Sequence, residues 1–447
     1  MPGLPASRRG GDMKRAIVVG SGAGGAMAAR ELAATFEVTV LEEGPEFKPF
    51  DHDLGRLARM RSTGLFVDPR MIRALFPAMR MRMAADRMAL VCGAATGGTT
   101  TLATGNALRC DDALLQLGID LGPEFGALLA ELPVSTDHER RWRPVTRELF
   151  SACDKLGLKP TVTPKLVDYS RCVRCGRCVL GCPTGAKWDS RDHLRQAIAR
   201  GARVLTGTKV ERVLLGGSGQ ETSRATGVVV RRRGRTRFLP ADLVVLAAGG
   251  FGTPAILRSS GLATQDRLFV DPVLCVAAPA EGSFSDQEVP MPFFTEGDGY
   301  IISPYFDYLS FFFERSWKRP GCDIVSLMIK LADTESGSVS GRGKVTKALS
   351  ARDRQRLAAA TESCVEILGS LGARRDSIFL GMLNAGHPGG TVPLTGRERD
   401  QLHSDDLPRN IYVADASLLP RSLGKPPSLT IMALAMRVAE VCKERFV

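Results

Sequence analysis

A glycine-rich turn between two apolar segments near the N-terminus is the feature that most constrains the fold of this chain. Residues 16–20 predict an apolar strand, a helix follows to residue 32, and residues 38–41 predict a second strand that ends in an acid, Glu42. The turn carries three glycines at the spacing G-x-G-x-x-G: Gly20, Gly22 and Gly25. In a βαβ unit the first permits the tight turn, the second lets the backbone approach a pyrophosphate at the helix N-terminus, and the third allows the helix to pack on the strand. Because Glu42 can bind a ribose hydroxyl, the sequence predicts an α/β fold with a dinucleotide site.

Composition indicates the class of protein and its compartment. The chain has 447 residues, of which 44% are hydrophobic, and this is enough for two domains with sizeable cores. Eleven cysteines without a secretory apolar segment favour the reducing cytoplasm, and no apolar stretch reaches the length of a membrane span. A net charge of +12 would attract acidic partners or anionic lipid. The sequence carries no nucleic-acid-binding module, so nucleic acid is not an expected partner.

The most basic segment, residues 56–87, alternates arginine with methionine and leucine. This pattern is typical of a cationic amphipathic helix. Two interpretations of residues 51–87 stay open. They form helices that dock on a membrane surface or a partner subunit, or they form a lid over the cofactor.

A run of four cysteines in the middle of the chain predicts an inorganic cofactor. The run has gaps of two, two and three residues, is followed by a proline, and consists of Cys172, Cys175, Cys178 and Cys182. The same spacing holds [4Fe–4S] clusters in bacterial ferredoxins. Gly176 and Gly181 would let the loop turn so that the thiolates converge while backbone N–H groups point at the sulfides.

Other uses of the cysteines stay open. In two-cluster ferredoxins the fourth cysteine of such a run ligates the other cluster. This chain has no second run, so either Cys182 or a distant cysteine would complete the site. A tetrahedral zinc site is an alternative, although zinc usually takes two separated C-x-x-C pairs. Disulfides, or a loop without a metal, are further alternatives.

Three later segments carry motifs of a single protein family. Residues 249–261 read Gly-Gly-Phe-Gly-Thr-Pro-Ala-Ile-Leu-Arg-Ser-Ser-Gly after an apolar strand at 243–247. Residues 410–417 read Asn-Ile-Tyr-Val-Ala-Asp-Ala-Ser, with Leu-Thr-Ile-Met-Ala-Leu-Ala at 429–435, and residues 97–100 read Gly-Gly-Thr-Thr. These segments resemble the second signature, the closing FAD segment and the flavin-contacting loop of the glucose–methanol–choline (GMC) oxidoreductases. The cysteine run beside Gly-Ala-Lys at 185–187 resembles that of a subset of this family.

The resemblance implies a fold and a domain organisation. The expected fold is a doubly wound, Rossmann-like FAD-binding domain with an inserted α+β substrate domain built on an antiparallel sheet. The FAD-binding domain would be discontinuous, with residues 13–50, 88–115, 165–265 and 385–447 and the cysteine loop at 170–190. Residues 116–164 and 266–384 would form the substrate domain. In the latter, the aromatic residues between Tyr305 and Trp317 predict a strand pair, and residues 352–371 predict a helix.

The resemblance also implies which residues hold FAD. The ADP moiety would lie against Gly20, Gly22, Gly25 and Glu42, with Val210 near the adenine. The residues expected near the rest of the cofactor are Gly97, Gly98 and Asn106 at the flavin, Gly250 in the second signature, and Asp415 and Thr430 near the ribityl chain or isoalloxazine.

His387, in Gly-His-Pro-Gly-Gly at 386–390, occupies the place of the family's active-site histidine. Oxidising an alcohol at a flavin requires a base for the hydroxyl proton, and a neutral imidazole titrating near pH 6.5 can accept it. The other four histidines lie in Arg- or Asp-rich stretches typical of solvated or helix-face residues: His52, His138, His193 and His403.

The family usually carries a second histidine or asparagine in the closing loop, where this chain has Pro426. Proline supplies neither a proton nor a hydrogen bond from its ring. Either Asn384 or Lys425 then substitutes, or the chemistry is not ordinary alcohol oxidation. Lys425 could stabilise an anionic reduced flavin, and a solvated lysine is the alternative.

Together these features predict a dehydrogenase, not primarily an oxidase, that uses FAD to oxidise the CH–OH group of an apolar, alcohol-type small molecule. Electrons would pass through the [4Fe–4S] cluster to an external acceptor such as a ferredoxin, cytochrome or quinone. One alternative reverses the flow, so that a reduced carrier feeds the flavin and an unsaturated or carbonyl substrate is reduced. Another is a non-catalytic electron-transfer subunit with zinc in its cysteine loop.

Overall fold

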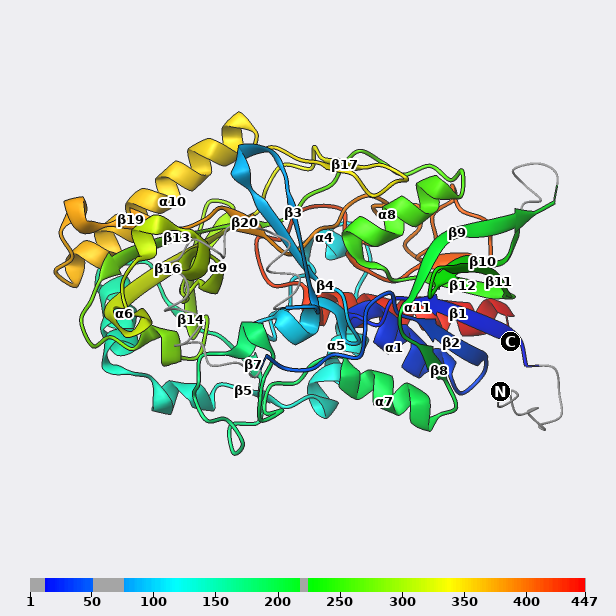
Figure 1. The fold of residues 1–447 in the computed structure, drawn as a ribbon, viewed down its shortest axis with the longest axis horizontal. Helices are drawn as coiled ribbons and strands as arrows, with labels where there is room; N and C mark the ends of the chain where they lie inside the picture. The colour runs from blue at the N-terminus through cyan, green and yellow to red at the C-terminus, as the bar shows by residue number, and fades with distance from the viewer. Residues whose placement is uncertain (1–12, 51–75, 218–223, 447) are drawn as a thin grey trace.

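The chain folds around two sheets that lie side by side along its long axis (Figure 1). This computed structural model describes residues 13–50, 76–217 and 224–446. The first sheet is five-stranded and wholly parallel. Its order is β21 (Ile411–Val413), β12 (Leu243–Leu246), β1 (Arg15–Val19), β2 (Glu37–Leu41) and β8 (Arg203–Leu205). The strands are short apolar runs because both faces of a parallel sheet are covered.

Helices and a small sheet cover the parallel sheet. Figure 1 shows α1 and α7 below it and α8 above it. The helices of this half are α1 (Ala23–Leu32), α5 (Gly122–Glu131), α7 (Arg191–Ala199), α8 (Gly249–Ser259) and α11 (Ser428–Phe446). A three-stranded antiparallel sheet packs against α8 and β12 and consists of β9 (Thr208–Gly216), β10 (Arg224–Arg232) and β11 (Arg235–Pro240). The predicted strand–helix–strand unit at residues 16–42 is confirmed as β1, α1 and β2.

The second sheet has nine strands and is antiparallel except where β20 runs parallel to β4. Along it lie β3 (Met79–Met83), β4 (Ala89–Gly93), β20 (Asn384–Ala385), β13 (Pro272–Pro279), β16 (Ile324–Leu331), β15 (Tyr300–Pro304), β14 (Phe293–Gly297) and β6 (Thr161–Val162), and β19 (Phe379–Leu380) also pairs with β13. Helix α10 (Ala351–Ser370) packs across β13, β15 and β16, and α6 (Pro144–Lys155) packs on α10. The predicted helix at 352–371 is thus confirmed as α10.

Two predictions about this half were wrong. Residues 79–83 form strand β3, not part of an amphipathic helix. Their sequence, Met-Arg-Met-Arg-Met, alternates with the period of two that suits a strand. The expected aromatic strand pair is also wrong, because residues 308–313 form helix α9 (Tyr308–Phe313), capped by Asp307, whose carboxylate accepts a hydrogen bond from the Leu309 N–H. Of the rest of the predicted lid or docking segment, Ala85–Arg87 form a 3₁₀ turn, and residues 51–75 lie outside the described residues.

The remaining strands and α-helix are short: α4 (Asp112–Leu115), β5 (Val134–Ser135), β7 (Lys165–Leu166), β17 (Ser338–Val339) and β18 (Val345–Thr346). Two 3₁₀ turns bear on the site, η4 (Gly98–Leu102) and η6 (Cys178–Leu180). Among the helices of the three described ranges, none is long and apolar enough to cross a membrane.

Candidate active site

A cavity of about 570 Å³ lies at the carboxyl ends of the parallel strands, where α/β sheets bind nucleotides. Gly20 has φ +98°, and a Cβ there would lie 2.2 Å from the carbonyl oxygen of Ala247, so the turn requires glycine. A Cβ on Gly25 would lie 2.1 Å from the Gly20 carbonyl oxygen, which confirms its packing role. At Gly22 an added Cβ would meet only the Gly98 Cα at 3.9 Å. The backbone before α1 is therefore open to the cavity, as an approaching pyrophosphate requires.

Glu42 closes one end of this cavity, which we name the nucleotide cavity. Its carboxylate accepts hydrogen bonds from the hydroxyl of Ser21 at 2.6 Å and the Gly44 N–H at 2.8 Å. Burial raises the pKa of Glu42, and these hydrogen bonds oppose the rise. At another wall, Asp415 accepts hydrogen bonds from the Gly249 N–H at 2.8 Å and the Thr253 hydroxyl at 2.5 Å. The predicted cofactor residues that line the cavity are Gly20, Gly22, Glu42, Gly98, Val210, Gly250 and Asp415.

Three other predicted cofactor residues act from behind the wall or in a neighbouring space. The Gly97 N–H donates to the Ser21 hydroxyl at 3.2 Å, which joins the glycine-rich turn to the segment before η4. Thr430 accepts a hydrogen bond from the Cys110 N–H at 3.0 Å. Asn106 lines a second cavity and accepts a hydrogen bond from Lys165.

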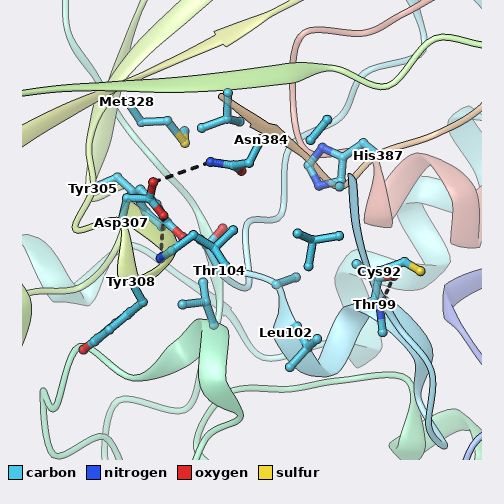
Figure 2. A pocket seen from close by; sticks show the side chains of 18 of the residues that line it. Cys92, Thr99, Leu102, Thr104, Tyr305, Asp307, Tyr308, Met328, Asn384 and His387 are labelled. Atoms are coloured by element: carbon cyan, nitrogen blue, oxygen red, sulfur yellow. Dashed lines mark hydrogen bonds between the residues drawn. The ribbon is translucent and has the colours of Figure 1, made fainter. Parts of the chain in front are cut away.

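The second cavity, of about 180 Å³, is bounded mostly by apolar side chains of the larger sheet and of α9. Its apolar wall includes Phe76, Met79, Val179, Leu180, Met291, Tyr305, Phe312 and Met328. Figure 2 shows Asn384 between Asp307 and His387 in this space. Cys92, Gly93, Gly386 and His387 are among the residues that line both cavities. The apolar cavity and the nucleotide cavity therefore meet at His387.

His387 follows β20, and its environment suits a base. Burial lowers its pKa, the cation of Lys330 lowers it further, and Asp271 opposes them. The imidazole is consequently neutral at neutral pH. Its Nδ1 is buried without a hydrogen bond and lies 3.7 Å from Asp271 Oδ2. The side chain as a whole is 23% exposed and lines both cavities.

Asp271 and Lys330 form a buried ion pair that the sequence reasoning missed. Lys330 Nζ lies 3.0 Å from Asp271 Oδ2, and the two side chains are 2% and 1% exposed. Burial alone would raise the pKa of Asp271, but Lys330, His387 and Ser422 together outweigh burial and lower that pKa to about 2. The available signal was one lysine in the otherwise uncharged strand Ile-Val-Ser-Leu-Met-Ile-Lys-Leu.

The proposed substitutes for the missing histidine or asparagine differ in placement. Asn384 lines the apolar cavity, and its side-chain amide donates to the Met382 carbonyl oxygen at 3.1 Å. Lys425 is absent from the walls of both cavities and pairs with Glu296 at 2.8 Å. Pro426 does line the apolar cavity.

Three of the other histidines, predicted to be solvated or helix-face residues, are buried, so the solvated alternative was wrong for them, although His193 does lie on helix α7. His138, His193 and His403 are 0%, 1% and 6% exposed. His138 contacts the Thr163 carbonyl oxygen at 2.8 Å, His193 pairs with Glu131 at 3.1 Å, and His403 contacts the Pro408 carbonyl oxygen at 3.2 Å. None of the three lines either cavity, and His52 lies outside the described residues.

The cysteine loop brings its four cysteines around one small cavity, which is lined by Cys172, Cys175, Cys178 and Cys182. Gly176 has φ +66°, and a Cβ there would lie 2.0 Å from the Asp286 carbonyl oxygen. Gly181 has φ +91°, and its Cβ would lie 2.6 Å from the Phe47 ring. Both glycines are thus required for the turns that were predicted. Across residues 13–50, 76–217 and 224–446, no group of three or more His, Cys, Asp or Glu side chains is placed to hold a metal ion.

Two buried lysines join this loop to the cavities. Lys187 Nζ donates to three carbonyl oxygens around η4, those of Thr100, Thr101 and Ala103, at 2.8–2.9 Å. Its backbone N–H donates to Cys182 Sγ at 3.4 Å. Although burial raises the pKa of the Cys182 thiol, this and neighbouring hydrogen bonds outweigh burial and lower it. Lys165 donates to the Pro290 carbonyl oxygen at 2.5 Å, and burial lowers its pKa to about 7.

A dinucleotide cavity that opens onto an apolar cavity, with a neutral histidine where they meet, defines an oxidoreductase of the nucleotide-cofactor class. The model of the GMC oxidoreductase family matches residues 15–276. An uncharacterised GMC-type oxidoreductase of Mycobacterium tuberculosis is 32% identical over 501 residues, which cover 95% of this chain and 75% of that protein. The chain belongs to the GMC oxidoreductase family, whose typical cofactor is FAD.

Two further likenesses agree. A long-chain-alcohol oxidase of Arabidopsis thaliana is 25% identical over 527 residues, which cover 96% of this chain and 67% of that protein. Pyridoxine 4-oxidase from Mesorbium loti superposes with a TM-score of 0.72 at 18% identity, over 97% of this chain and 99% of that chain. This likeness confirms the predicted α/β fold, with a Rossmann-like parallel sheet and a largely antiparallel substrate-domain sheet.

Proposed function

We propose that this GMC-type oxidoreductase oxidises the CH–OH group of an apolar, alcohol-type substrate bound in the apolar cavity. His387 accepts the hydroxyl proton on Nε2. FAD, when bound, takes up the hydride equivalent from the carbinol carbon. Glu42 and the open backbone at Gly22 would hold its ADP part, and Gly98, Gly250 and Asp415 would face the rest.

One observation carries this proposal, namely that His387 lines both cavities. A base must reach the substrate hydroxyl while the carbinol carbon faces the flavin, so it has to stand at the boundary of the two spaces. The apolar wall favours a substrate with a long or bulky hydrocarbon part, because burying apolar surface supplies binding energy. The Arabidopsis relative, named a long-chain-alcohol oxidase, supports the same substrate class.

The test is anaerobic reduction of bound flavin by a panel of long-chain alcohols and sterols. In the variant His387→Asn we expect reduction to slow by about 10²–10⁴-fold, the usual contribution of a general base. Flavin content and melting temperature of the variant serve as controls. Unchanged reduction rates in a folded, flavin-loaded variant would reject the base.

We further propose that the cysteine loop holds a [4Fe–4S] cluster. A tetrahedral zinc site needs its ligand atoms about 2.3 Å from one ion. In a four-iron cluster each thiolate binds a different iron, so the sulfurs stand further apart around a shared space, and the four cysteines do line one cavity. Val179 and Leu180, from the same loop, line the apolar cavity. The cluster would therefore lie next to the catalytic space and offer electrons a one-electron exit.

With this exit the enzyme would act as a dehydrogenase that passes electrons to a ferredoxin, cytochrome or quinone. On this proposal residues 13–50, 88–115, 165–265 and 385–447 hold FAD and the cluster, and residues 116–164 and 266–384 bind the substrate. Comparing oxygen uptake with reduction of a one-electron dye distinguishes a dehydrogenase from an oxidase. Rapid turnover with oxygen alone would contradict the external acceptor.

The reverse flow, from a reduced carrier to an unsaturated or carbonyl substrate, is favoured by one observation. Pro426 lines the apolar cavity where the family's second polar residue usually stands. Mixing the oxidised enzyme with reduced ferredoxin, without substrate, tests this direction. Flavin bleaching by the carrier together with no bleaching by any alcohol would establish it.

A further inference from the structure

The apolar cavity contains a buried cation, the ammonium group of Lys330, that has no role in the proposed reaction. Lys330, on β16, lines the apolar cavity, as does Pro426, whose ring supplies no donor. Its ammonium contacts Asp271 twice, at 3.0 Å to Oδ2 and 3.5 Å to the backbone carbonyl oxygen. An ion pair this deeply buried costs several kcal/mol of desolvation per ion, so it is weak evidence for stability alone.

Asp271 is held rigidly in front of β13. Its Oδ1 accepts hydrogen bonds from the Ser422 hydroxyl and from the Gly424 N–H at 3.3 Å. Its backbone has φ +51°, a strained value for a residue other than glycine. These contacts leave Oδ2 facing both the Lys330 ammonium at 3.0 Å and the buried Nδ1 of His387 at 3.7 Å.

We infer that Lys330 and Asp271 together replace the second polar residue that the closing loop lacks. Asp271 selects the His387 tautomer that carries its proton on Nδ1, and the Lys330 ammonium keeps the ring neutral, so that Nε2 is free to accept a proton. A rotation of the ring that shortens the 3.7 Å separation makes the Nδ1–H···Oδ2 hydrogen bond. Both residues are positioning residues, because they act through His387.

The proton and electron balance follows directly. The substrate O–H bond breaks and its proton moves to His387 Nε2, while the C–H pair leaves as hydride to the oxidised cofactor. The imidazolium that forms is stabilised by the Asp271 carboxylate, which stays ionised because Lys330, His387 and Ser422 together lower its pKa to about 2. The carboxylate thus remains available as an acceptor throughout the reaction.

Asp271 and Lys330 are the charged groups that act directly on His387. Asp333 and its partner Lys347, 2.6 Å apart, are linked to Asp271 through Ser422. The other charged residues on the cavity walls are Asp307 in the apolar cavity and Glu42, Glu43, Arg80, Arg82, Lys209, Glu211, Arg342 and Asp415 in the nucleotide cavity.

The inference rests on the proposed function, and its test uses two readouts on the flavin-loaded protein. The first is the pH profile of flavin reduction by substrate. The second is an NMR titration of ring-labelled histidine, which is practical because the chain has only five histidines, with His387→Asn identifying the resonance. In Lys330→Met the cation that lowers the His387 pKa is gone. The pKa should therefore rise by about 1 unit or more, and the acid limb of the profile should move up with it.

A matched control is Lys347→Met, which removes the other buried lysine of the network and likewise leaves one aspartate unpaired. It should not move the His387 titration. Asp271→Asn should shift the titration down and slow flavin reduction at every pH. If Lys330→Met fails to fold, the pair variant Lys330→Met with Asp271→Asn removes both charges together, and it should lose the Nδ1–H tautomer signature in the ring nitrogen shifts.

A His387 titration that is unchanged in folded Lys330→Met, or that is shifted equally by Lys347→Met, would overturn the inference. Failure of the proposed function gives a different result. If His387 is not the base, the alcohol still reduces the flavin in His387→Asn. The titration of His387 in the parent protein and in Lys330→Met still shows whether Lys330 acts on the ring.

Discussion

Single glycines fix where the nucleotide cavity lies. Gly25 places α1 so close to β1 that the Gly20 carbonyl oxygen occupies the space a Cβ would need. Because α1 begins at the turn, this close contact also sets where its N-terminus points. The stability of the α1–β1 packing and the binding of the cofactor therefore both depend on the contact between Gly25 and the Gly20 carbonyl oxygen.

We expect Gly25→Ala to lower the free energy of unfolding by about 1–3 kcal/mol, because overpacking forces the helix away from the strand. It should also reduce the flavin content. Urea denaturation and flavin absorbance measure the two effects. Gly126→Ala is the control, since Gly126 lies exposed in α5 with nothing within 4 Å of an added Cβ, and there alanine should add about 0.5–1 kcal/mol. Equal effects at the two sites would contradict the packing role of Gly25.

Some residues of the candidate site could be predicted from sequence, and others could not, for a physical reason. Gly20, Gly22 and Glu42 belong to one local unit whose spacing alone places them. Asp271 and Lys330 are 59 positions apart and meet because the antiparallel register pairs Val273 with Lys330 across β13 and β16. Register between distant strands is not encoded locally, so no spacing rule could join the pair.

At the scale of elements, local period was a better guide than composition. The mixture of arginine with methionine and leucine over residues 56–87 predicts a cationic amphipathic helix, yet the strict alternation within residues 79–83 indicates a strand. The aromatic run 308–313 is too short for periodicity to separate strand from helix, and Asp307, an N-cap residue directly before it, was the usable signal. The α10 helix was long enough, at 20 residues, for its period to be clear.

The cysteine loop yields an element-scale prediction. Protein prepared without oxygen should contain about four irons and four acid-labile sulfides per chain. Cys178→Ser should lose most of both, because it removes one of the four thiols around the loop cavity. Cys322→Ser, a free cysteine outside the loop, should keep the content of the parent protein. Zinc without iron in the parent protein, or equal iron in both variants, would refute the cluster.

At the scale of the whole molecule, the protein is positively charged, and part of this charge lies on the cysteine loop. The net charge is +12, and Arg171 and Arg174 lie exposed on the cysteine loop. Such a field speeds the approach of acidic proteins and is screened over about 10 Å at 0.1 M salt.

We therefore expect reduction of an acidic carrier protein to slow at least several-fold between low and 0.5 M salt, as screening removes the attraction. A neutral quinone should be reduced at nearly the same rate in both conditions. Stopped-flow mixing of substrate-reduced enzyme with each acceptor measures this. Rates with the protein carrier that ignore salt would show that the basic loop does not guide the encounter.

Lys187 links the cysteine loop to the wall of the nucleotide cavity. Its ammonium donates hydrogen bonds to three carbonyl groups around η4, beside the nucleotide cavity, and its backbone N–H donates to the Cys182 sulfur. If the proposed cluster orders the cysteine loop, its loss would also displace the η4 wall of the nucleotide cavity. On this proposal, protein made by iron-starved cells would also lose FAD and its yellow colour.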